Sequence, residues 1–247
     1  MMQGIPLQEF IAHCKDIERL RDLWCAALDF FHSRGIAMVS YHSDDAEAPG
    51  AAPLAIVEDG FPRDWVSKYI DGNLSRIDPI PELAAKLNRP FRWSEAGELA
   101  ALTEDQKHYM QLLAAAKLGD GLAMQVYGPN MRNAYIELGF GANTAELSAQ
   151  DISELRCAAQ MAHLRYCEIT ADRQHRAELS PIELEVLRWI AEGKSNSVIA
   201  DILGISRHTV DTMTRRMFEK LEVHDRTSAA VRGLGSGLLH YRHQQAG

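Results

Sequence analysis

The strongest constraint on the fold is a pair of glycines near the carboxyl end of the chain, each of which closes a short stretch with helical periodicity. Gly193 follows a stretch in which large apolar residues recur every three or four positions, and Gly204 follows a second such stretch over residues 196–203. Glycine is favoured directly after a helix because it adopts positive φ without steric cost. Ser206 then offers a capping hydroxyl to a third helix, so the pattern predicts a helix-turn-helix module.

The first of these helices has a clear start signal. Ser180, Pro181 and Glu183 supply a cap hydroxyl, a proline at the first helical position and an acid three residues after the cap. The apolar residues expected on its buried side are Leu184, Leu187, Ile190 and Ala191. The module therefore begins at about residue 179 and contributes a small core of its own.

The third helix has two chemically different faces. Its apolar residues fall within a narrow arc at about 100° per residue and are expected to be buried: Val210, Met213, Met217 and Leu221. The opposite face carries polar residues that can reach base edges or phosphates in a major groove: His208, Asp211, Thr212, Arg215, Arg216 and Glu219. A solvated face of an ordinary helical bundle is the alternative explanation, but the capped helix-turn-helix pattern favours DNA binding.

The sequence of this module resembles the carboxyl-terminal domain of LuxR-type regulators. The resemblance covers the whole module and rests on the segments EVLRWIAEGKS, IADILGIS, HTVDT and KL followed by RTSAA. It implies that the residues facing bases are Asp211, Thr212 and Arg215. It also implies that Lys194, Ser206 and Thr209 lie near phosphates, and the polar face of the helix adds His208 and Arg216 to the candidate DNA-binding residues.

The net charge of −8 is unusual for a DNA-binding protein, but the charge is unevenly distributed. Residues 179–247 contain nine basic and eight acidic residues, whereas the rest of the chain contains 17 basic and 26 acidic ones. The stretch 207–220 alone carries four basic and two acidic residues. Attraction to phosphate is therefore local, and we expect that a homodimer with two copies of the module is needed to bind double-stranded DNA.

The cysteines predict neither a disulfide framework nor a metal site. Cys14, Cys25, Cys157 and Cys167 form no close pair, and no histidine or cysteine stands at metal-ligand spacing. The sequence shows no signal-peptide pattern and no apolar run long enough to span a membrane. We therefore expect free thiols in a cytoplasmic, nucleoid-associated protein with no membrane partner, no metal and no cofactor.

The first 170 residues predict a separate domain. Helices are expected over residues 5–31, 62–71, 79–86, 104–117 and 149–170, and strands over 36–41, 53–57, 91–93, 122–127 and 134–140. Helices that flank hairpin-connected strands predict an α/β/α sandwich, which can hold a buried ligand. The segment 171–178 has no large apolar side chain and is the predicted linker to an all-α domain over 179–247. The fold class is therefore α+β.

One stretch of the first domain combines aromatic residues with an acid. Trp65 and Tyr69 are one helical turn apart on one face, and Asp78 precedes a proline at a turn or helix-cap position. Each has an ordinary explanation, in which the aromatic residues, with Trp93, pack in a core and Asp78 caps a helix. On spacing alone, that explanation is favoured.

The same residues resemble, in order and spacing, the signature of the acyl-homoserine-lactone-binding domain of quorum-sensing regulators, which also includes Gly121. The resemblance implies that Trp65 donates its indole N–H to the lactone carbonyl and that Asp78 accepts the amide N–H of the ligand. It also implies that Tyr69 and Trp93 wall the pocket. A small amphipathic ligand needs an apolar cavity with a few fixed polar groups, and tryptophan offers both.

Two positions depart from that family's pattern. The family often has tyrosine at Phe61, which here lacks a hydroxyl to donate to the acyl carbonyl. Glu137 stands where the family often has a small residue, with Tyr135 on the same face of the strand, and an ionised carboxylate is costly to bury. Either Glu137 is protonated and donates, or it meets a donor on the ligand, or it faces solvent. Alternation does not decide, because Ile136 and Leu138 form the more apolar face.

The sequence thus predicts a ligand-responsive, homodimeric transcriptional regulator that senses an N-acyl-homoserine lactone autoinducer and binds a palindromic operator. A LuxR-type regulator of another small molecule, or of none, is the alternative that Phe61 and Glu137 keep open. A response regulator would need a receiver domain with an early acidic cluster, whereas Asp44 and Asp45 lie in a loop-like stretch. An enzyme with a DNA-binding tail would need a nucleophile elbow, a metal cluster or a phosphate loop, so catalysis is not expected.

Overall fold

A computed structural model describes residues 4–43, 55–141, 147–171 and 178–239 of the chain, and these fall into two compact units that divide near Ala171. The predicted linker lies almost entirely outside the described residues, as do the first two residues of the strand expected over 53–57 and the loop with Asp44 and Asp45. Each unit is described by itself below.

The first unit is built on one antiparallel sheet with the strand order β2-β1-β5-β4-β3. Its strands are β1 Met38–Ser43, β2 Ala55–Asp59, β3 Phe91–Arg92, β4 Gly121–Val126 and β5 Ala134–Gly139. At the centre of the sheet, Ser40 pairs with Glu137 and His42 pairs with Tyr135 across β1 and β5. This register brings four polar side chains together on one face of the sheet.

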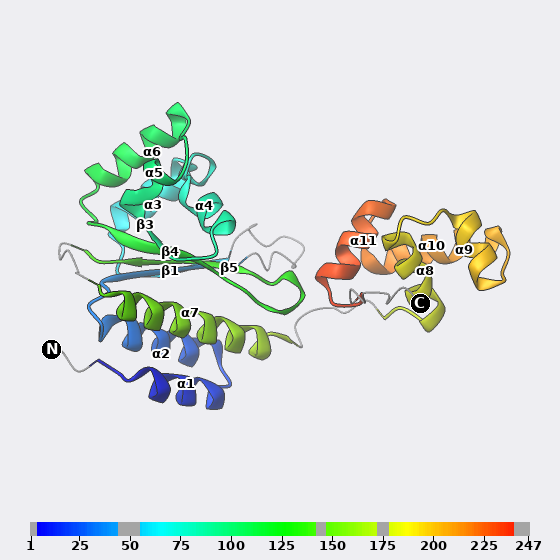
Figure 1. Ribbon diagram of the computed structural model, residues 1–247, viewed down its shortest axis with the longest axis horizontal. Coiled ribbons are helices and arrows are strands. Elements are labelled where there is room, and N and C mark those ends of the chain that lie inside the picture. Colours follow the sequence, from blue (N-terminus) through cyan, green and yellow to red (C-terminus); the bar gives the residue numbers. More distant parts are fainter. Residues whose placement is uncertain (1–3, 44–54, 142–146, 172–177, 240–247) are drawn as a thin grey trace. The chain divides into compact units, whose positions relative to one another are not determined.

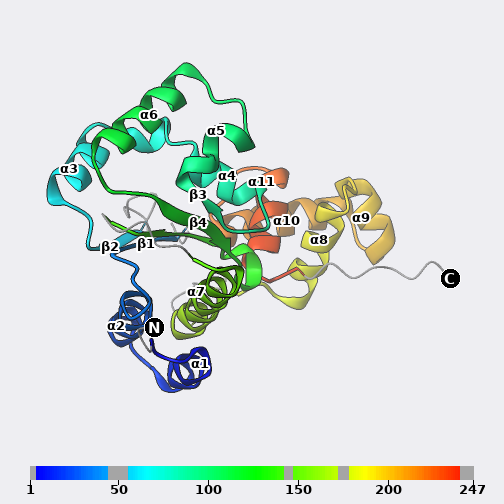
Figure 2. The same ribbon diagram turned by 60° about the vertical axis from the view of Figure 1, so that its left-hand side comes forward.

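Helices cover both faces of the sheet (Figures 1 and 2). One layer contains α1 Leu7–Asp16, α2 Leu20–His32 and α7 Ala149–Ile169. The other contains α3 Arg63–Asp71, α4 Ile80–Lys86, α5 Ala96–Leu99 and α6 Glu104–Ala115, with the short 3-10 turns η1 Leu74–Arg76 and η2 Trp93–Glu95. A third turn, η3 Pro129–Met131, joins β4 to β5. The predicted α/β/α sandwich is confirmed.

Each face of the sheet carries its own core. The core beneath α2 and α7 contains, among others, Phe30, Leu122, Leu138 and Leu155, and the core beneath α3 to α6 contains Trp65, Ile80, Phe91, Trp93 and Tyr109. Along β5, Ile136 and Leu138 face the first core while Tyr135 faces the second. Because both faces are covered, the polar side of β5 points into the protein and not toward solvent.

The second unit is a bundle of four helices, α8 Pro181–Ala191, α9 Asn196–Leu203, α10 Arg207–Leu221 and α11 Arg226–Gly235. Ser180 and Ser206 cap α8 and α10 as predicted, and Gly204 ends α9 with φ 66°. Four hydroxyl or carboxylate caps in one small domain satisfy backbone N–H groups that would otherwise lack partners. The all-α second domain with a helix-turn-helix is confirmed.

Two details of the second unit differ from the helical-wheel predictions. On α10 the buried position is Thr214, whereas Met213 is only half-buried at the edge of the core. On α8, Ala191 is exposed and Val186 takes its place in the core. On each helix the buried arc therefore lies slightly to one side of the arc predicted from the helical wheel. No helix in the described part of the chain is long and apolar enough to cross a membrane.

Candidate functional site

The first candidate site is a cavity of about 60 Å³ between the sheet and helices α3 and α6. Its lining residues are Ser40, His42, Ile56, Glu58, Phe61, Trp65, Val66, Tyr69, Ile70, Trp93, Tyr109, Leu113 and Glu137. Two of these, Ile56 and Ile70, are exposed to 42% and 64%, so the cavity reaches the surface between β2 and α3. The site is thus a mostly apolar recess with polar groups at its base on the sheet.

Three aromatic rings form the helical wall. Trp65 and Tyr69 stand one turn apart on α3, with ring centroids 6.4 Å apart, and Tyr109 from α6 lies 6.3 Å from each of them. The Tyr69 and Tyr109 rings meet edge to face at 76°, an arrangement that the ring quadrupoles favour. This cluster fixes the hydroxyl groups of both tyrosines in one place.

Asp78 lies behind that wall and accepts hydrogen bonds from the hydroxyl groups of its two tyrosines. Tyr69 donates to Asp78 Oδ2 over 3.0 Å, the Ile80 backbone N–H donates to Oδ1 over 2.9 Å, and Tyr109 donates as well. Burial raises the pKa of the Asp78 carboxyl to about 6, against the lowering effect of these donors. Asp78 therefore both accepts the first backbone N–H of α4, whose N-cap is Pro79, and stands as an acid behind the pocket, although it is not itself among the lining residues.

Glu137 forms the polar base of the cavity, on the central strand β5. Ser40 donates to its Oε2 over 3.0 Å, and Tyr135 donates to its Oε1. His42 Nε2 lies 2.9 Å from Ser40 Oγ, and since that hydroxyl donates its proton to Glu137, the imidazole N–H is the donor to Ser40. In this network, the His42 N–H donates to Ser40, and the Ser40 and Tyr135 hydroxyls both donate to the Glu137 carboxylate.

Burial sets the protonation behaviour of this group. The pKa of Glu137 is raised to about 7, chiefly by burial and next by the nearby Asp78 charge, against the lowering effect of the Tyr135 and Ser40 hydroxyls. Burial lowers the pKa of His42 to about 4, so this imidazole is neutral near pH 7. The pKa values of Glu137 in the cavity and of Asp78 behind its wall therefore lie near neutrality, and the described lining residues include neither lysine nor arginine.

Trp93 closes the cavity beside the sheet. Its six-membered ring lies so close to β4 and β5 that a Cβ added at Gly121 would come within 2.6 Å of it, and one at Gly139 within 3.0 Å. Glycine is thus required opposite the indole on both strands. The Trp93 Nε1 atom is buried and has no hydrogen-bond partner in the described structure, which is uncommon enough to suggest a missing acceptor.

The structure brings the predicted pocket residues together. Phe61, Trp65, Tyr69, Trp93 and Glu137 line the cavity, and the remaining two residues, Asp78 and Tyr135, hydrogen-bond to lining residues. Glu137 is half-buried and lines the cavity on the helix-covered face of the sheet, so the possibility that it faces bulk solvent is excluded.

Sequence reasoning missed eight of the lining residues, among them three that belong to the hydrogen-bond networks of Asp78 and Glu137: Ser40, His42 and Tyr109. Ser40 and His42 lie on β1, and their alternation with Val39 and Tyr41 offered only a weak signal. Tyr109 lies on the helix predicted over 104–117, and only the three-dimensional structure places it beside Trp65.

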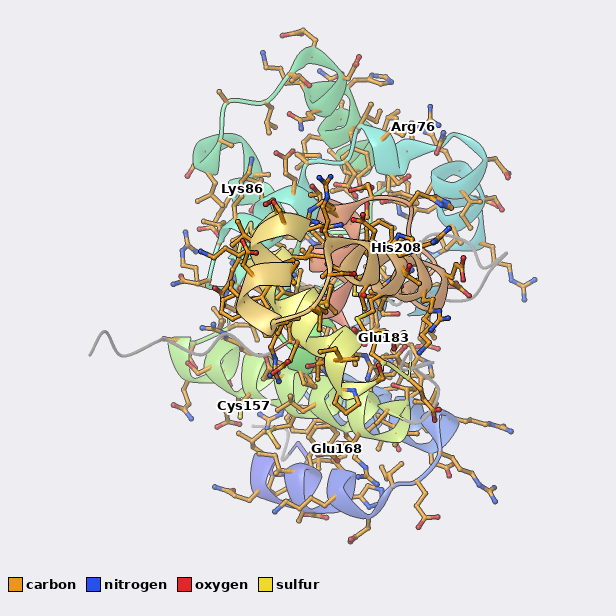
Figure 3. The ribbon with its side chains drawn as sticks, turned by 90° about the vertical axis from the view of Figure 1, so that its right-hand side faces the viewer. Arg76, Lys86, Cys157, Glu168, Glu183 and His208 are labelled. Atoms are coloured by element: carbon orange, nitrogen blue, oxygen red, sulfur yellow. The ribbon has the colours of Figure 1, made fainter. Side chains whose placement is uncertain are left out.

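The second candidate site is the exposed face of α10. His208, Asp211, Arg215 and Arg216 are exposed, as is the capping Ser206, whereas Lys194, Thr209 and Thr212 are half-buried. The predicted residues therefore share one accessible region of the bundle, around the start of α10. Figure 3 labels His208 on α10 and Glu183 on α8 in this unit.

A hydrogen-bond network holds Asp211 in place. Asn196 Nδ2 donates to Asp211 Oδ1 over 2.7 Å, and Arg226 donates to the Asn196 side-chain oxygen over 2.5 Å. Arg226 also donates to the Lys194 backbone carbonyl. Helices α9, α10 and α11 are thus tied together next to the exposed face, which keeps its side chains in a fixed geometry.

An ion pair between an exposed lysine and a buried acid anchors α10 to α8. Lys220 Nζ lies 2.7 Å from Glu183 Oε2, and Glu183 is only 5% exposed. The same carboxylate accepts from the Ser180 backbone N–H over 2.8 Å, and these donors lower its pKa against the effect of burial. The capping residue predicted from sequence therefore also fixes the angle between the two helices.

Two other cavities could serve as sites, but neither is stronger than the two candidates above. A groove of about 460 Å³ beside α10 is open and shares Asp211 and Arg215 with the exposed face. A recess of about 140 Å³ between α2, α7 and the other face of the sheet is almost wholly apolar. The described residues contain no cluster of histidine, cysteine or acidic side chains that could hold a metal ion.

Comparison with protein families gives two matches. Residues 19–166 match the family described as the autoinducer binding domain, and residues 177–232 match the family described as bacterial regulatory proteins of the luxR family. The first match contains the cavity, and the second contains the exposed face of α10.

Individual relatives agree with both matches. The chain is 28% identical over 190 residues to the HTH-type quorum sensing-dependent transcriptional regulator RpaR of Rhodopseudomonas palustris, a match that covers 76% of each chain. It is 24% identical over 179 residues to the transcriptional activator protein TraR of Rhizobium radiobacter, covering 70% of this chain and 76% of that one. These relatives are regulators and not enzymes.

Solved structures share the fold. The crystal structure of Escherichia coli SdiA aligns with a TM-score of 0.76 and 20% identity, covering 95% of this chain and 98% of the other. The structure of SdiA in complex with octanoyl-rac-glycerol aligns with a TM-score of 0.71 and 22% identity, covering 96% of both chains.

Proposed function

The chain belongs to the LuxR family of quorum-sensing transcriptional regulators, and from this premise we propose that it senses an N-acyl-homoserine lactone and binds a near-palindromic operator as a homodimer. The observation that carries the ligand assignment is the cavity, where one wall of aromatic rings meets two buried acids. A lactone head group has hydrogen-bond acceptors and one amide donor, and its acyl chain is apolar. The cavity offers a partner to each of these parts.

The lactone would bind with its head at the helical wall. Trp65 is buried at that wall and donates its indole N–H to the lactone carbonyl, while the amide N–H is accepted by Asp78. A carboxylate has about four acceptor positions, of which the donors of Asp78 occupy three, so one remains for the ligand. Reaching it requires the ligand to pass between the two tyrosine hydroxyl groups that cover the acid.

The acyl chain would extend to the rim. Pockets for such ligands usually measure about 300–1,000 Å³, and the cavity of about 60 Å³ has room for only part of the molecule. The exposed Ile56 and Ile70 lie where the cavity meets the surface. We therefore expect the acyl chain of the ligand to displace these two side chains and to cover them. Ligand binding would then bury apolar surface that the free protein exposes, and stabilise the folded first domain.

The second domain would bind the operator through α10. Arg215 is exposed near the middle of the helix and suits the O6 and N7 atoms of guanine, while Lys194, Ser206 and Thr209 are placed to contact phosphates around its start. One domain carries little net positive charge, so two copies are needed for useful affinity, and their symmetry would match an operator with two half-sites. Action on a chromosomal operator places the protein with the DNA in the cytoplasm.

A regulator of a different small molecule is the second candidate. Glu137 in the cavity and the absence of a hydroxyl on Phe61 both favour it, because a plain acyl carbonyl finds an acid where it needs a donor.

The decisive experiment is titration calorimetry of the full chain with a panel of N-acyl-homoserine lactones, run beside selection of operator sequences from random duplexes. We expect at least one lactone to bind, and Trp65→Phe to weaken it about tenfold by deleting one N–H donor. Trp24→Phe, the same change on the opposite face of the sheet, serves as the control and should bind normally. If the wild type selects a palindromic site but binds no lactone, the lactone assignment is wrong, and the protein is a DNA-binding regulator of another ligand.

A further inference from the structure

The acid at the base of the cavity has acceptor capacity that the protein does not use. Glu137 offers about four acceptor positions, and only the hydroxyl groups of Ser40 and Tyr135 occupy them. Both hydroxyls donate to the carboxylate, so neither can offer a proton to a ligand at the same time. A ligand that reaches Glu137 therefore finds an acceptor there.

The charges around the cavity point the same way. Its described lining residues contain two acids, Glu58 and Glu137, and neither lysine nor arginine, while His42 is neutral and uses its N–H on Ser40. A negatively charged ligand, or a carbonyl oxygen placed against Glu137, would meet repulsion in a region of low dielectric constant. A donor placed there would be favoured by a hydrogen bond to a charged group, which is about twice as strong as a neutral one.

A buried donor next to the cavity is also unpaired. The Trp93 N–H has no acceptor in the described structure, and the Trp93 side chain lines the same cavity as Glu137. A hydroxyl group is the smallest group that donates and accepts at once. It can donate to the Glu137 carboxylate while its own oxygen still accepts a hydrogen bond.

These observations indicate which subclass of lactone fits the cavity, and the inference rests on the proposed function. We propose that the autoinducer is an acyl-homoserine lactone with a hydroxyl group on the acyl chain close to the amide, and that Glu137 selects it by accepting the hydroxyl proton. The hydroxyl must be within a few bonds of the amide, because Asp78 and Glu137 lie close enough to affect each other's ionisation and the cavity between the walls is small.

The proposal has a signature in proton uptake and release. The groups that face Glu137 from the elements packed around it are Tyr135 on β5, Ser40 and His42 on β1, Tyr69 on α3, Tyr109 on α6 and Asp78 ahead of α4. Since burial holds the pKa of Glu137 at about 7, the group is partly protonated near neutral pH. A donor on the ligand stabilises the ionised form and lowers that pKa, so binding releases a proton. A carbonyl stabilises the protonated form, so binding takes a proton up.

The test uses three probes that differ at one carbon: N-octanoyl-, N-(β-hydroxyoctanoyl)- and N-(β-oxooctanoyl)-homoserine lactone. Calorimetry of the full chain near pH 7, in buffers of different ionisation enthalpy, gives affinity and proton linkage together. We expect the hydroxy compound to bind about tenfold more tightly than the oxo compound and to release protons. Its affinity should rise between pH 5.5 and 7.5, whereas that of the oxo compound should not.

Glu137→Gln gives the matched comparison, because the amide keeps the shape and can still bond to Ser40 and Tyr135. It should reduce the preference for the hydroxy compound by about tenfold and abolish the release of protons. Glu98→Gln, the same change at an exposed acid on α5 that does not line the cavity, should leave both unchanged. Equal or tighter binding of the oxo compound, or proton uptake with the hydroxy compound, overturns the inference while lactone sensing stands. Failure of all three probes and of every other lactone overturns both.

Discussion

The buried carboxyl of Glu137 gives a prediction about stability that needs no ligand. In the folded protein its side chain is surrounded by the sheet, Tyr135 and Ser40, and burial raises its pKa from the ordinary value of 4.5 to about 7. A carboxyl with a higher pKa in the folded state binds more protons when folded than when unfolded. The stability that it contributes is therefore complete below the unfolded pKa and is lost as the pH rises toward the folded pKa.

The magnitude follows from the size of the change. One pKa unit corresponds to about 1.4 kcal/mol, so a rise from 4.5 to about 7 corresponds to roughly 3 kcal/mol lost between those two pH values. Glu137→Gln does not titrate. We expect the variant and the wild type to be similarly stable at about pH 4.5, and the variant to be more stable by up to about 3 kcal/mol at pH 7.5.

Urea unfolding of the ligand-free chain at several pH values measures this difference. Tryptophan fluorescence follows mainly the first unit, since Trp24, Trp65 and Trp93 belong to it and only Trp189 belongs to the second. Glu58→Gln, the same change at an exposed position, is the control and should track the wild type. If the difference in free energy of unfolding between the wild type and Glu137→Gln is the same at pH 5 and pH 7.5, Glu137 does not ionise in a buried site.

Three further predictions concern the two candidate sites. Asp78→Asn should weaken lactone binding about tenfold in calorimetry, because a hydrogen bond to a neutral group replaces one to a charged group, and Asp71→Asn on the same side of the domain should not. Arg215→Ala should cost roughly 1–3 kcal/mol of binding to the selected operator in fluorescence anisotropy, while Lys194→Ala should weaken binding to all duplexes alike and flatten the salt dependence. Sedimentation should show that a dimer is the species on a full operator, and a monomer that binds it with undiminished affinity would contradict this.

The helices and strands were predictable because their signals are local. Ser180 and Ser206 begin helices, and Gly204 ends one with positive φ, through interactions within a few residues. The orientation of Glu137 was not predictable in this way. Alternation along β5 says that Glu137 and Ile136 face opposite sides, but both sides of this sheet are covered by helices, so neither side is solvent.

The candidate pocket was predictable only where its residues lie close together in the sequence. Trp65 and Tyr69 are one turn apart, so their shared wall followed from helix geometry. Tyr109 completes that wall from a helix about forty residues away, and His42 reaches the same cavity from β1. Contacts of this kind depend on how the layers pack, and the composition of one segment does not specify them.

The last prediction concerns how the second domain distinguishes one operator from another. Asp211 is an exposed acid on the same helix face as Arg215, and an acid accepts a hydrogen bond from cytosine N4 while it repels the acceptors of guanine. Such a contact needs a fixed carboxylate, which Asn196 provides by donating over 2.7 Å while Arg226 holds the Asn196 oxygen over 2.5 Å. The specificity ratio is the affinity for the selected operator divided by the affinity for an operator changed at one base pair. Asn196→Ala should therefore reduce this ratio about fivefold, with little change in salt dependence. Ser197→Ala, an exposed change at the next residue, should preserve the ratio. If Asn196→Ala lowers affinity for every duplex by the same factor, Asn196 only maintains the bundle, and Asp211 reads no base through it.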